Sequence, residues 1–361
     1  MRIGILSMQK IPNYGSFLQA FSLKKQFEKR GHEVYFIDIE KGRQIVKSKT
    51  ESSSILLKLD RYALTRLKNY FFYRKMIKIH QNDYLTFLNT QKRLPEGEMF
   101  DVVLIGSDEV FNAAVPSAWG FTPQLFGKVD CAKHVVSYAA SCGQTTAEIV
   151  KNLNVDKEIC DAMSRLELIS VRDDNTYDFV VSLTNREPLK NIDPVFLTDY
   201  SEYIPKTTWK KPYMLVYAYG NRIDDENEIH AIKAYAKEEK IDILCVGMQQ
   251  RWCKNNITAS AFELLSYVKN AACIVTDTFH GTVFSIKYNK QFVSIIRDSN
   301  RNKLTDLLKN FDLCDREVTQ SRELPSKMKA AIDYNKVNEI LTTKQDEAFA
   351  CLGEICERGA L

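Results

Sequence analysis

The strongest constraint on the fold is a regular alternation of short apolar runs with stretches of helical spacing. RIGILSM (2–8) is a continuous apolar run, and after a turn-rich segment residues 16–27 place apolar side chains at helical intervals. EVYFIDIE (33–40) is a second apolar run, and Gly31 just before it is placed to end the helix. Strand, helix and strand in this order build parallel sheets that are buried between helices. The chain is therefore predicted to be an α/β protein.

The alternation runs through the first half of the chain and restarts after a turn-forming segment at 198–212. Further strands are predicted at 101–108, 134–141, 168–173, 213–220, 242–248, 272–277 and 291–296. Helices are predicted at 225–240, 260–271, 281–289, 300–310 and 325–357. We infer an N-terminal Rossmann-like domain over 1–200, a C-terminal one over 201–320, and C-terminal helices over 321–361 that are expected to pack back on the first domain.

Composition and charge exclude several classes of protein. Hydrophobic residues at 45% of 361 residues give enough apolar surface for a buried core and exclude a disordered chain. A formal charge of +4 gives no basis for nucleic-acid binding, so no nucleic-acid partner is predicted. The nine cysteines form no CxxC pair and no His, Asp and Glu group has metal-ligand spacing, so neither disulfides nor a metal is predicted. Without a signal peptide or a bilayer-spanning apolar stretch, a cytoplasmic location is expected.

Residues 41–79 are more basic than the rest of the chain. Eleven Lys or Arg residues face two acids there, Glu51 and Asp60, which gives a local charge of +9. Apolar residues interleave with these charges: Leu56, Leu57, Leu59, Tyr62, Leu64, Leu67, Tyr70, Phe71 and Phe72. Two interpretations remain open, a basic amphipathic helix at an anionic membrane surface or polyanionic ligand, and the solvated face of an inserted helical lid. We predict a basic helical insert at about 41–95.

Ligands of such folds bind beyond the carboxyl ends of strands, where loops lead into helix N-termini. No loop contains GxGxxG or GxxxxGK[ST], which removes the best support for a dinucleotide or ATP. In TDTFHGTVFSIKY (276–288), a strand ends and a helix begins, so His280 is held at a helix N-terminus. Its imidazole can move a proton there, Gly281 allows close backbone approach, and hydroxyls come from Thr278 and Thr282. The alternative is a histidine bonded to a backbone carbonyl in a tight turn.

The loop IPNYGS is the equivalent of this one in the first domain. Asn13 and Gly15 permit a sharp turn, and Ser16 is expected to cap the following helix. The loop suits an anion or sugar hydroxyls, and the alternative is an ordinary loop with a good helix cap.

Two further loops carry hydrogen-bonding groups at strand ends. GSDEVFN places Ser107, Asp108 and Asn112 just past a strand, and SYAASCG ends a strand in small residues that include Ser141. These side chains are candidates for the lining of a cleft. Asp108 is either a general base or a cap for the next helix.

Three arginines also follow predicted strands. Arg172, in SVRDDN, lies at a strand end where a guanidinium can grip a carboxylate or phosphate, and Arg297 and Arg301 follow the strand QFVSII. Each alone is typical of a surface or ion-pair residue. Together with His280 they favour an anionic substrate.

A series of motifs resembles one family, the polysaccharide pyruvyl transferases. The motifs occur in the family's order over about 1–316: NYGSFLQAFSL (13–23), GSDEVFN (106–112), SYAASCG (137–143), SVRDD (170–174), DPVFLTD (193–199), FELLSYVKNAACIVTDTFHGTVFSIKYNKQFVSI (262–295) and Arg301. The resemblance implies a glycosyltransferase B-like arrangement, in which the two Rossmann-like domains face a cleft. It also implies transfer of pyruvate from phosphoenolpyruvate, as a co-substrate, onto two sugar hydroxyls as a cyclic ketal, without a metal or organic cofactor.

The resemblance assigns roles to the loop residues. His280 and Asp108 are then catalytic, and Ser107, Asn112 and Ser141 bind the saccharide acceptor. The donor-binding residues are Arg172, Thr278, Gly281, Thr282, Arg297, Arg301, Asn13 and Gly15. Acceptors of the family are often lipid-linked, which gives residues 41–79 a reason to contact the inner face of the plasma membrane.

One position departs from the family pattern. Many members carry an arginine two residues before the equivalent of His280, whereas this chain has Thr278. Arg297, Arg301 or a residue of the basic insert is expected to replace the missing charge. The departure keeps two alternatives open: a nucleotide-sugar glycosyltransferase of similar two-domain fold, and a non-catalytic saccharide-binding relative.

Overall fold

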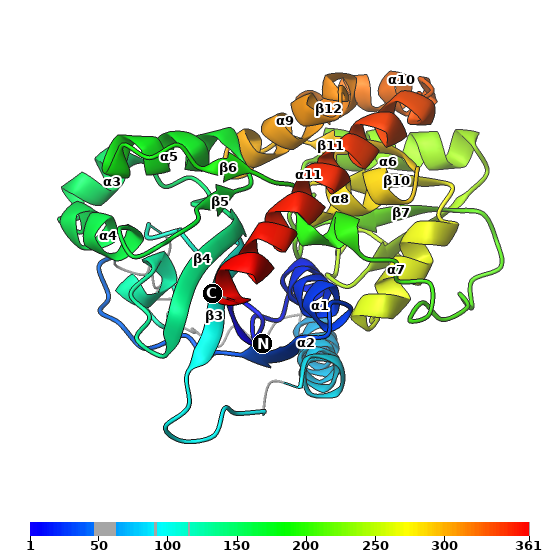
Figure 1. The fold of residues 1–361 in the computed structure, drawn as a ribbon. Coiled ribbons are helices and arrows are strands. Elements are labelled where there is room, and N and C mark those ends of the chain that lie inside the picture. The colour runs from blue at the N-terminus through cyan, green and yellow to red at the C-terminus, as the bar shows by residue number, and fades with distance from the viewer. Residues whose placement is uncertain (47–62, 90–91, 115, 361) are drawn as a thin grey trace.

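Two parallel β-sheets form the core of the structure, a computed structural model that describes residues 1–46, 63–89, 92–114 and 116–360 (Figure 1). The first sheet contains β1 (Arg2–Leu6), β2 (Glu33–Phe36), β3 (Phe100–Asp108), β4 (Ala132–Ala140), β5 (Ser170–Val171) and β6 (Leu189–Lys190). The second contains β7 (Tyr213–Tyr217), β8 (Asp242–Val246), β9 (Asn255–Ile257), β10 (Cys273–Thr276), β11 (Gln291–Ile295) and β12 (Glu317–Val318). All neighbouring strands of the two sheets pair in parallel.

The strand order of both sheets reverses beside the first strand of each. The first sheet has the order β2-β1-β3-β4-β5-β6 and the second the order β12-β11-β10-β7-β8-β9. Loops that leave the carboxyl ends of strands at such a reversal point diverge, and they open a crevice in which ligands bind. Here these are the loops after β1 and β3 in the first half and after β7 and β10 in the second. The predicted α/β fold with two Rossmann-like halves is confirmed.

Helices cover both sheets and follow the strands. They are α1 (Tyr14–Glu28), α2 (Ala63–Asp83), α3 (Ala147–Asn152), α4 (Asp156–Met163), α5 (Asp174–Thr184), α6 (Glu226–Glu238), α7 (Ala261–Asn270), α8 (Phe279–Lys287), α9 (Arg301–Asn310), α10 (Leu324–Lys329) and α11 (Tyr334–Ala360). Short 3₁₀ turns add η2 (Pro123–Phe126), η3 (Pro194–Leu197), η4 (Cys314–Arg316) and η5 (Ser321–Glu323), and a π-helical turn, η1 (Tyr84–Leu88), extends α2.

The long helix α11 joins the two halves. In Figure 1 it runs obliquely from the second half to the first and ends near the N-terminus. Its apolar stripe of Val337, Ala348, Cys351, Leu352 and Ile355 is buried, and it packs on β3, β4 and η3. Because burial of a side chain such as Leu352 or Ile355 stabilises a fold by about 1.5–3 kcal/mol, this stripe anchors α11 on the first half.

Several element boundaries differ from the sequence-based predictions. The strand predicted at 33–40 ends at Phe36, since the side-chain amides of Gln9 and Gln124 take the backbone groups that a longer strand would pair. The strand predicted at 168–173 is only β5. The short strands β6, β9 and β12 were not predicted, because two or three residues of polar sequence give no periodic signal.

The first helix starts earlier than predicted. α1 begins at Tyr14, and the capping side chain is that of Asn13, whose Oδ1 accepts from the backbone N–H of Gly15 and of Ser16 at 2.8 and 3.4 Å. Ser16 was expected to be the cap. It lies inside the first turn instead, and its hydroxyl is free to bond to another element.

Two parts of the basic insert lie outside the described residues, namely 47–62 and 90–91, and the first of them includes Leu56, Leu57, Leu59 and Tyr62. The described part contains α2 and η1. Their inner side is buried through Met76, His80, Asp83, Tyr84 and Leu88, and it packs on α1.

Candidate active site

His280 lies at the start of α8, where the chain leaves β10 of the second sheet. Thr278 caps this helix: its Oγ1 accepts from the N–H of Gly281 at 2.9 Å, and its own N–H donates to Thr276 Oγ1 at 3.1 Å. The cap places the imidazole in the first turn of the helix, at the positive end of the helix dipole. His280 is 7% exposed.

The start of α1, in the first half, meets the same imidazole. A Cβ atom on Gly15 would lie 2.0 Å from His280 Nδ1, so only glycine allows this approach. The hydroxyl of Tyr14 donates to the carbonyl of Ala259 at 2.8 Å and ties the two halves together at this point. Two helix N-termini, one from each half, therefore converge on His280.

A cavity between the halves lies in front of this junction. It is lined by Pro12, Asn13 and Tyr14 from the first half and by Tyr217, Ala218, Tyr219, Met248, Thr278 and His280 from the second. None of these lining residues, within the described part of the chain, carries a carboxylate. An imidazole between two helix N-termini, with hydroxyl and amide side chains around it, is suited to hold an anion and to move a proton.

Asp193 connects His280 to Arg172. Its Oδ2 accepts from Arg172 Nη1 at 2.8 Å and lies 3.4 Å from His280 Nε2. Asp193 is 2% exposed, and burial alone would raise its pKa, but His280 and Arg172 hold the pKa of this carboxyl below its ordinary value. The charged carboxylate lies on the Nε2 side of the ring, and Gly15 approaches the ring atoms Nδ1, Cγ and Cε1. A buried carboxylate behind an imidazole fixes the orientation of the ring.

Arg172 is held on two sides. Its guanidinium lies over the Phe279 ring, 4.0 Å from the centroid, in addition to its bond to Asp193. Burial disfavours its charge, but Asp193 and the nearby carboxylates of Asp108, Asp173 and Glu109 raise the pKa of Arg172 above its ordinary value. The cation is therefore fixed in place before any ligand binds.

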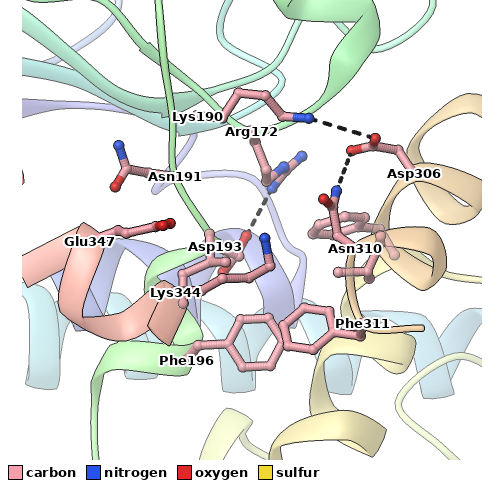
Figure 2. Close-up of a pocket in the computed structure, with 13 residues that line it drawn as sticks. Arg172, Lys190, Asn191, Asp193, Phe196, Asp306, Asn310, Phe311, Lys344 and Glu347 are labelled. Atoms are coloured by element: carbon pink, nitrogen blue, oxygen red, sulfur yellow. Dashed lines mark hydrogen bonds and ion pairs between the residues drawn. The ribbon is translucent and has the colours of Figure 1, made fainter. Parts of the chain in front are cut away.

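A second cavity lies beside the Arg172 and Asp193 pair. Figure 2 shows Arg172 and Asp193 at this cavity, with Lys190 and Asp306 on one side and Phe196, Phe311, Lys344 and Glu347 around it. The Lys190 ammonium lies 3.9 Å from Asp306, so the charges that line it are largely paired among themselves. The pair between Arg172 and Asp193 thus lines the second cavity, whereas His280, which Asp193 also faces, lines the first.

Lys303 and Glu109 form an ion pair across the cleft. Lys303 Nζ, from α9 of the second half, lies 2.5 Å from Glu109 Oε1, just after β3 of the first. A third cavity between the halves is lined by Glu109, Asn112, Gly143, Gln144, Ser299, Asn300, Asn302 and Lys303. Tyr219, which lines the cavity at His280, interacts electrostatically with both Lys303 and Glu109. Tyr219 therefore lies near both cavities.

The structure places the predicted acceptor-binding residues in different surroundings. Asn112 lines the cavity at Lys303, and its amide donates to Glu109 Oε2 at 2.8 Å. Ser107 and Ser141, expected to line the cleft, are fully buried instead. The hydroxyl of Ser107 donates to the Ala139 carbonyl at 3.0 Å, and that of Ser141 donates to Asp173 at 2.6 Å, so both hold loops in place.

Asp108 ends β3 and lies near the start of α1. Its Oδ2 accepts from the hydroxyl of Ser16 at 2.5 Å, and its backbone has a φ of +82°, in the left-handed region. A residue other than glycine in this conformation is uncommon and is concentrated at functional sites. The carboxylate therefore stays a candidate base, held beside the helix N-terminus that meets His280.

Arg297 and Arg301 take no part in the ion pair between Arg172 and Asp193. Arg297 donates two bonds to Glu228, at 2.7 and 2.6 Å, so its charge is neutralised within the second half. Arg301 is half-exposed and lies 3.3 Å from Asp298. Both were predicted to bind the donor, and both have a carboxylate partner already.

Gly281 and Thr282 lie in the first turns of α8 and pack against the second sheet. A Cβ on Gly281 would lie 2.0 Å from Thr276 Oγ1, so the close approach at this glycine is to β10. The hydroxyl of Thr282 is buried, bonds to the Thr278 carbonyl at 3.2 Å and contacts Ser294 Oγ at 2.7 Å. These two residues shape the loop that carries His280.

Four residues at this site were not singled out by the sequence: Asp193, Glu109, Lys303 and Tyr219. Asp193 and Glu109 stand within the quoted motifs DPVFLTD and GSDEVFN, so a signal for them was present. Lys303 and Tyr219 gave no such signal, because only the folded chain brings α9 and the loop after β7 to the cleft.

Within the described residues, no cluster of three or more His, Cys, Asp or Glu side chains is arranged to hold a metal ion. The helices described there are also too short or too polar to span a bilayer.

Comparisons with known proteins identify the family and the fold of this chain. The profile of the polysaccharide pyruvyl transferase family matches residues 13–299. Among curated proteins, no sequence match was found. Among solved structures, UGT89C1 of Arabidopsis thaliana, complexed with UDP-L-rhamnose, is similar over 99% of both chains, with 10% identity and a TM-score of 0.52. The glycotransferase of kitacinnamycin is similar over 99% of this chain and 98% of its own, with 12% identity and a TM-score of 0.50. These likenesses show a glycosyltransferase B-like fold.

Proposed function

This chain belongs to the polysaccharide pyruvyl transferase family, and we propose that it transfers pyruvate from phosphoenolpyruvate onto two hydroxyls of a saccharide as a cyclic ketal. The observation that carries the proposal is the position of His280, between two helix N-termini and with a charged carboxylate behind it. A general acid next to an anion site is what this transfer requires.

The donor is a small molecule with a phosphate and a carboxylate. The helix N-termini of α1 and α8 supply partial positive charge at the cavity that contains His280. None of the described residues that line this cavity carries a carboxylate. Asn13 and Thr278 add polar side chains at its wall. One anionic group of the donor is placed there, next to His280.

His280 moves the proton in the proposed reaction. The imidazolium gives a proton to the methylene carbon of the enol ester, C2 becomes electrophilic, and a first sugar hydroxyl forms a bond to it. The C2–O bond to phosphate then breaks and a second hydroxyl closes the ketal. Of the two hydroxyl protons, one restores the imidazolium and the other leaves with phosphate. We assign Asp108 as the acceptor of a hydroxyl proton and Asp193 as the group that orients the His280 ring.

Lys303 supplies a positive charge in place of the arginine that many family members carry at the position of Thr278. Among the cations named here that follow β11, Arg297 is bound by Glu228 and Arg301 lies half-exposed beside Asp298, whereas Lys303 lines the cleft. Its partner Glu109 keeps the pKa of Lys303 above its ordinary value, so the ammonium is charged when the donor arrives. We assign the second anionic group of the donor to Lys303, with Arg172 stabilising the site behind Asp193.

The experiment that tests the proposal compares two donors. The purified chain is incubated with a saccharide acceptor and either phosphoenolpyruvate or a UDP-sugar, and the release of phosphate or UDP is followed. Acceptor-dependent phosphate release supports the proposal. UDP release would support the glycosyltransferase alternative, and acceptor binding without either product would support a non-catalytic saccharide-binding protein.

A further inference from the structure

The outward side of α2 carries large apolar side chains in contact with solvent. Tyr70, Phe71 and Tyr73 are 55%, 59% and 53% exposed, and Leu85 in the following turn η1 is 51% exposed. These four residues are called the aromatic face below. Figure 1 shows α2 at the edge of the molecule, beside α1. A cluster of exposed aromatic and aliphatic side chains of this kind marks an interaction surface.

The charge around the aromatic face has one sign. Arg74, Lys75 and Lys78 are exposed on the same helix. Asp83 is the acid of residues 70–89, and it is turned inward, where its Oδ2 accepts from the N–H of Ala261 at 2.9 Å. Exposed aromatic residues next to lysine and arginine are typical of a helix that lies in the interface of an anionic membrane.

The helix is firmly attached to the protein through its other side. Met76, His80 and Asp83 are buried, and the His80 ring lies 4.5 Å from that of Tyr14. Lys24 of α1 donates to the carbonyl of Phe87 at 2.7 Å. Because the inner side of α2 is buried against the rest of the fold, the aromatic face points away from the core and is available to a partner.

A groove connects this surface with the candidate active site. Ile77, His80, Tyr84 and Leu85 line the groove, together with Pro12. Pro12 also lines the cavity that contains His280. A molecule whose apolar part lies along α2 would therefore present its polar end at the loop that carries Asn13 and Gly15.

We propose that the aromatic face docks on an anionic lipid surface, and that the groove guides the apolar part of a lipid-linked saccharide to the cleft. The first part stands on exposure and charge alone. The second part rests on the proposed pyruvyl transfer. The aromatic side chains enter the headgroup region, and Arg74, Lys75 and Lys78 pair with lipid phosphates.

Vesicle binding by the full chain tests the docking without donor or acceptor. Vesicles of phosphatidylcholine alone are compared with vesicles that also contain phosphatidylglycerol, by co-sedimentation. We expect at least tenfold tighter binding to the anionic vesicles. The variants Y70S/F71S/Y73S and K75Q/K78Q are expected to lose most of this binding. K237Q/K240Q, which removes two exposed lysines from the other half, is the matched control and is expected to bind like the wild type.

The outcomes separate the two parts of the proposal. Equal binding by wild type and both α2 variants, or no preference for anionic vesicles, would overturn the docking. A chain that binds vesicles through α2 but releases no phosphate from phosphoenolpyruvate would keep the docking and lose the proposed function. If transfer to a lipid-linked acceptor in vesicles falls in Y70S/F71S/Y73S while transfer to a short soluble saccharide does not, the groove's role is supported. Equal effects on both acceptors would contradict it.

Discussion

Arg172 and Arg297 are both arginines at strand ends, and both pair with a carboxylate, but the two carboxylates lie in different surroundings. Asp193, the partner of Arg172, also faces His280, whereas Glu228 binds Arg297 with both oxygens inside the second half. Two arginines at strand ends, each in an ion pair, therefore differ in their surroundings: only the counter-ion of Arg172 is shared with the imidazole. The predictions below separate the two pairs.

Asp193→Asn is expected to have the largest effect on turnover. The amide keeps the shape of the carboxylate but removes the charge that faces His280 Nε2, so the imidazole ring is less well oriented. We expect kcat for phosphate release from phosphoenolpyruvate to fall by about 10²- to 10³-fold. Wild-type kcat in a folded D193N chain would contradict the role assigned to the shared carboxylate.

Arg172→Met is expected to lower both activity and stability. It leaves Asp193 buried without its strongest hydrogen-bonded cation, which costs about 3–5 kcal/mol of unfolding free energy. Activity is expected to fall by ~10²-fold, as for the loss of a positioning charge. Denaturant unfolding and steady-state kinetics measure the two effects. Arg172→Lys keeps the charge and should recover part of the stability; no difference between the two variants would contradict a role for the charge.

Lys303→Met is expected to act mainly on the donor. Removal of the ammonium should raise KM for phosphoenolpyruvate about tenfold while kcat changes less, because Lys303 binds an anionic group and does not move the proton. Glu109→Gln, which frees Lys303 from its partner, serves as the comparison and should not raise KM. A KM unchanged in K303M would remove the assignment.

Arg297→Met is expected to spare turnover. The change breaks the pair with Glu228 and should lower the unfolding free energy by about 1–3 kcal/mol, while kcat/KM for phosphoenolpyruvate stays within about twofold of the wild type. If R297M lost as much activity as R172M, the two arginines would have the same role although their partners differ, which would contradict the comparison.

The smallest expected effect is on the pH dependence of stability. Because the folded chain holds the pKa of Asp193 below its ordinary value, this group stabilises the fold above the unfolded pKa of about 4, and the contribution is lost as the pH falls through the lower folded value. Acid denaturation of wild type and D193N should therefore differ in slope in this range, with the shallower slope in D193N. Identical slopes would contradict the shift.

Much of the fold could be predicted from the sequence, because apolar runs of four or more residues between helical stretches mark buried parallel strands. β1, β3, β7 and β10 all carry this signal. Strands of two or three residues carry none, and the cap of α1 was assigned to Ser16 because a serine at a turn resembles a cap as closely as Asn13 does.

The candidate site was predictable where chemistry and motif coincide, as at His280 and Arg172. Contacts between distant segments could not be predicted, since no pattern in the sequence indicates that Lys303 pairs with Glu109 or that Arg297 pairs with Glu228. Ser107 and Ser141 show the same limit: a strand-end serine can face the cleft or the core, and only the packing of neighbouring loops decides.

The most direct test of the central claim is the mass of a saccharide acceptor after incubation with phosphoenolpyruvate and either the wild-type chain or His280→Ala. We expect the wild type to add one pyruvyl ketal to the acceptor, and the variant, folded and still able to bind the acceptor, to form it at least ~10²-fold more slowly. An acceptor of unchanged mass with the wild type, or equal rates with both chains, would contradict it.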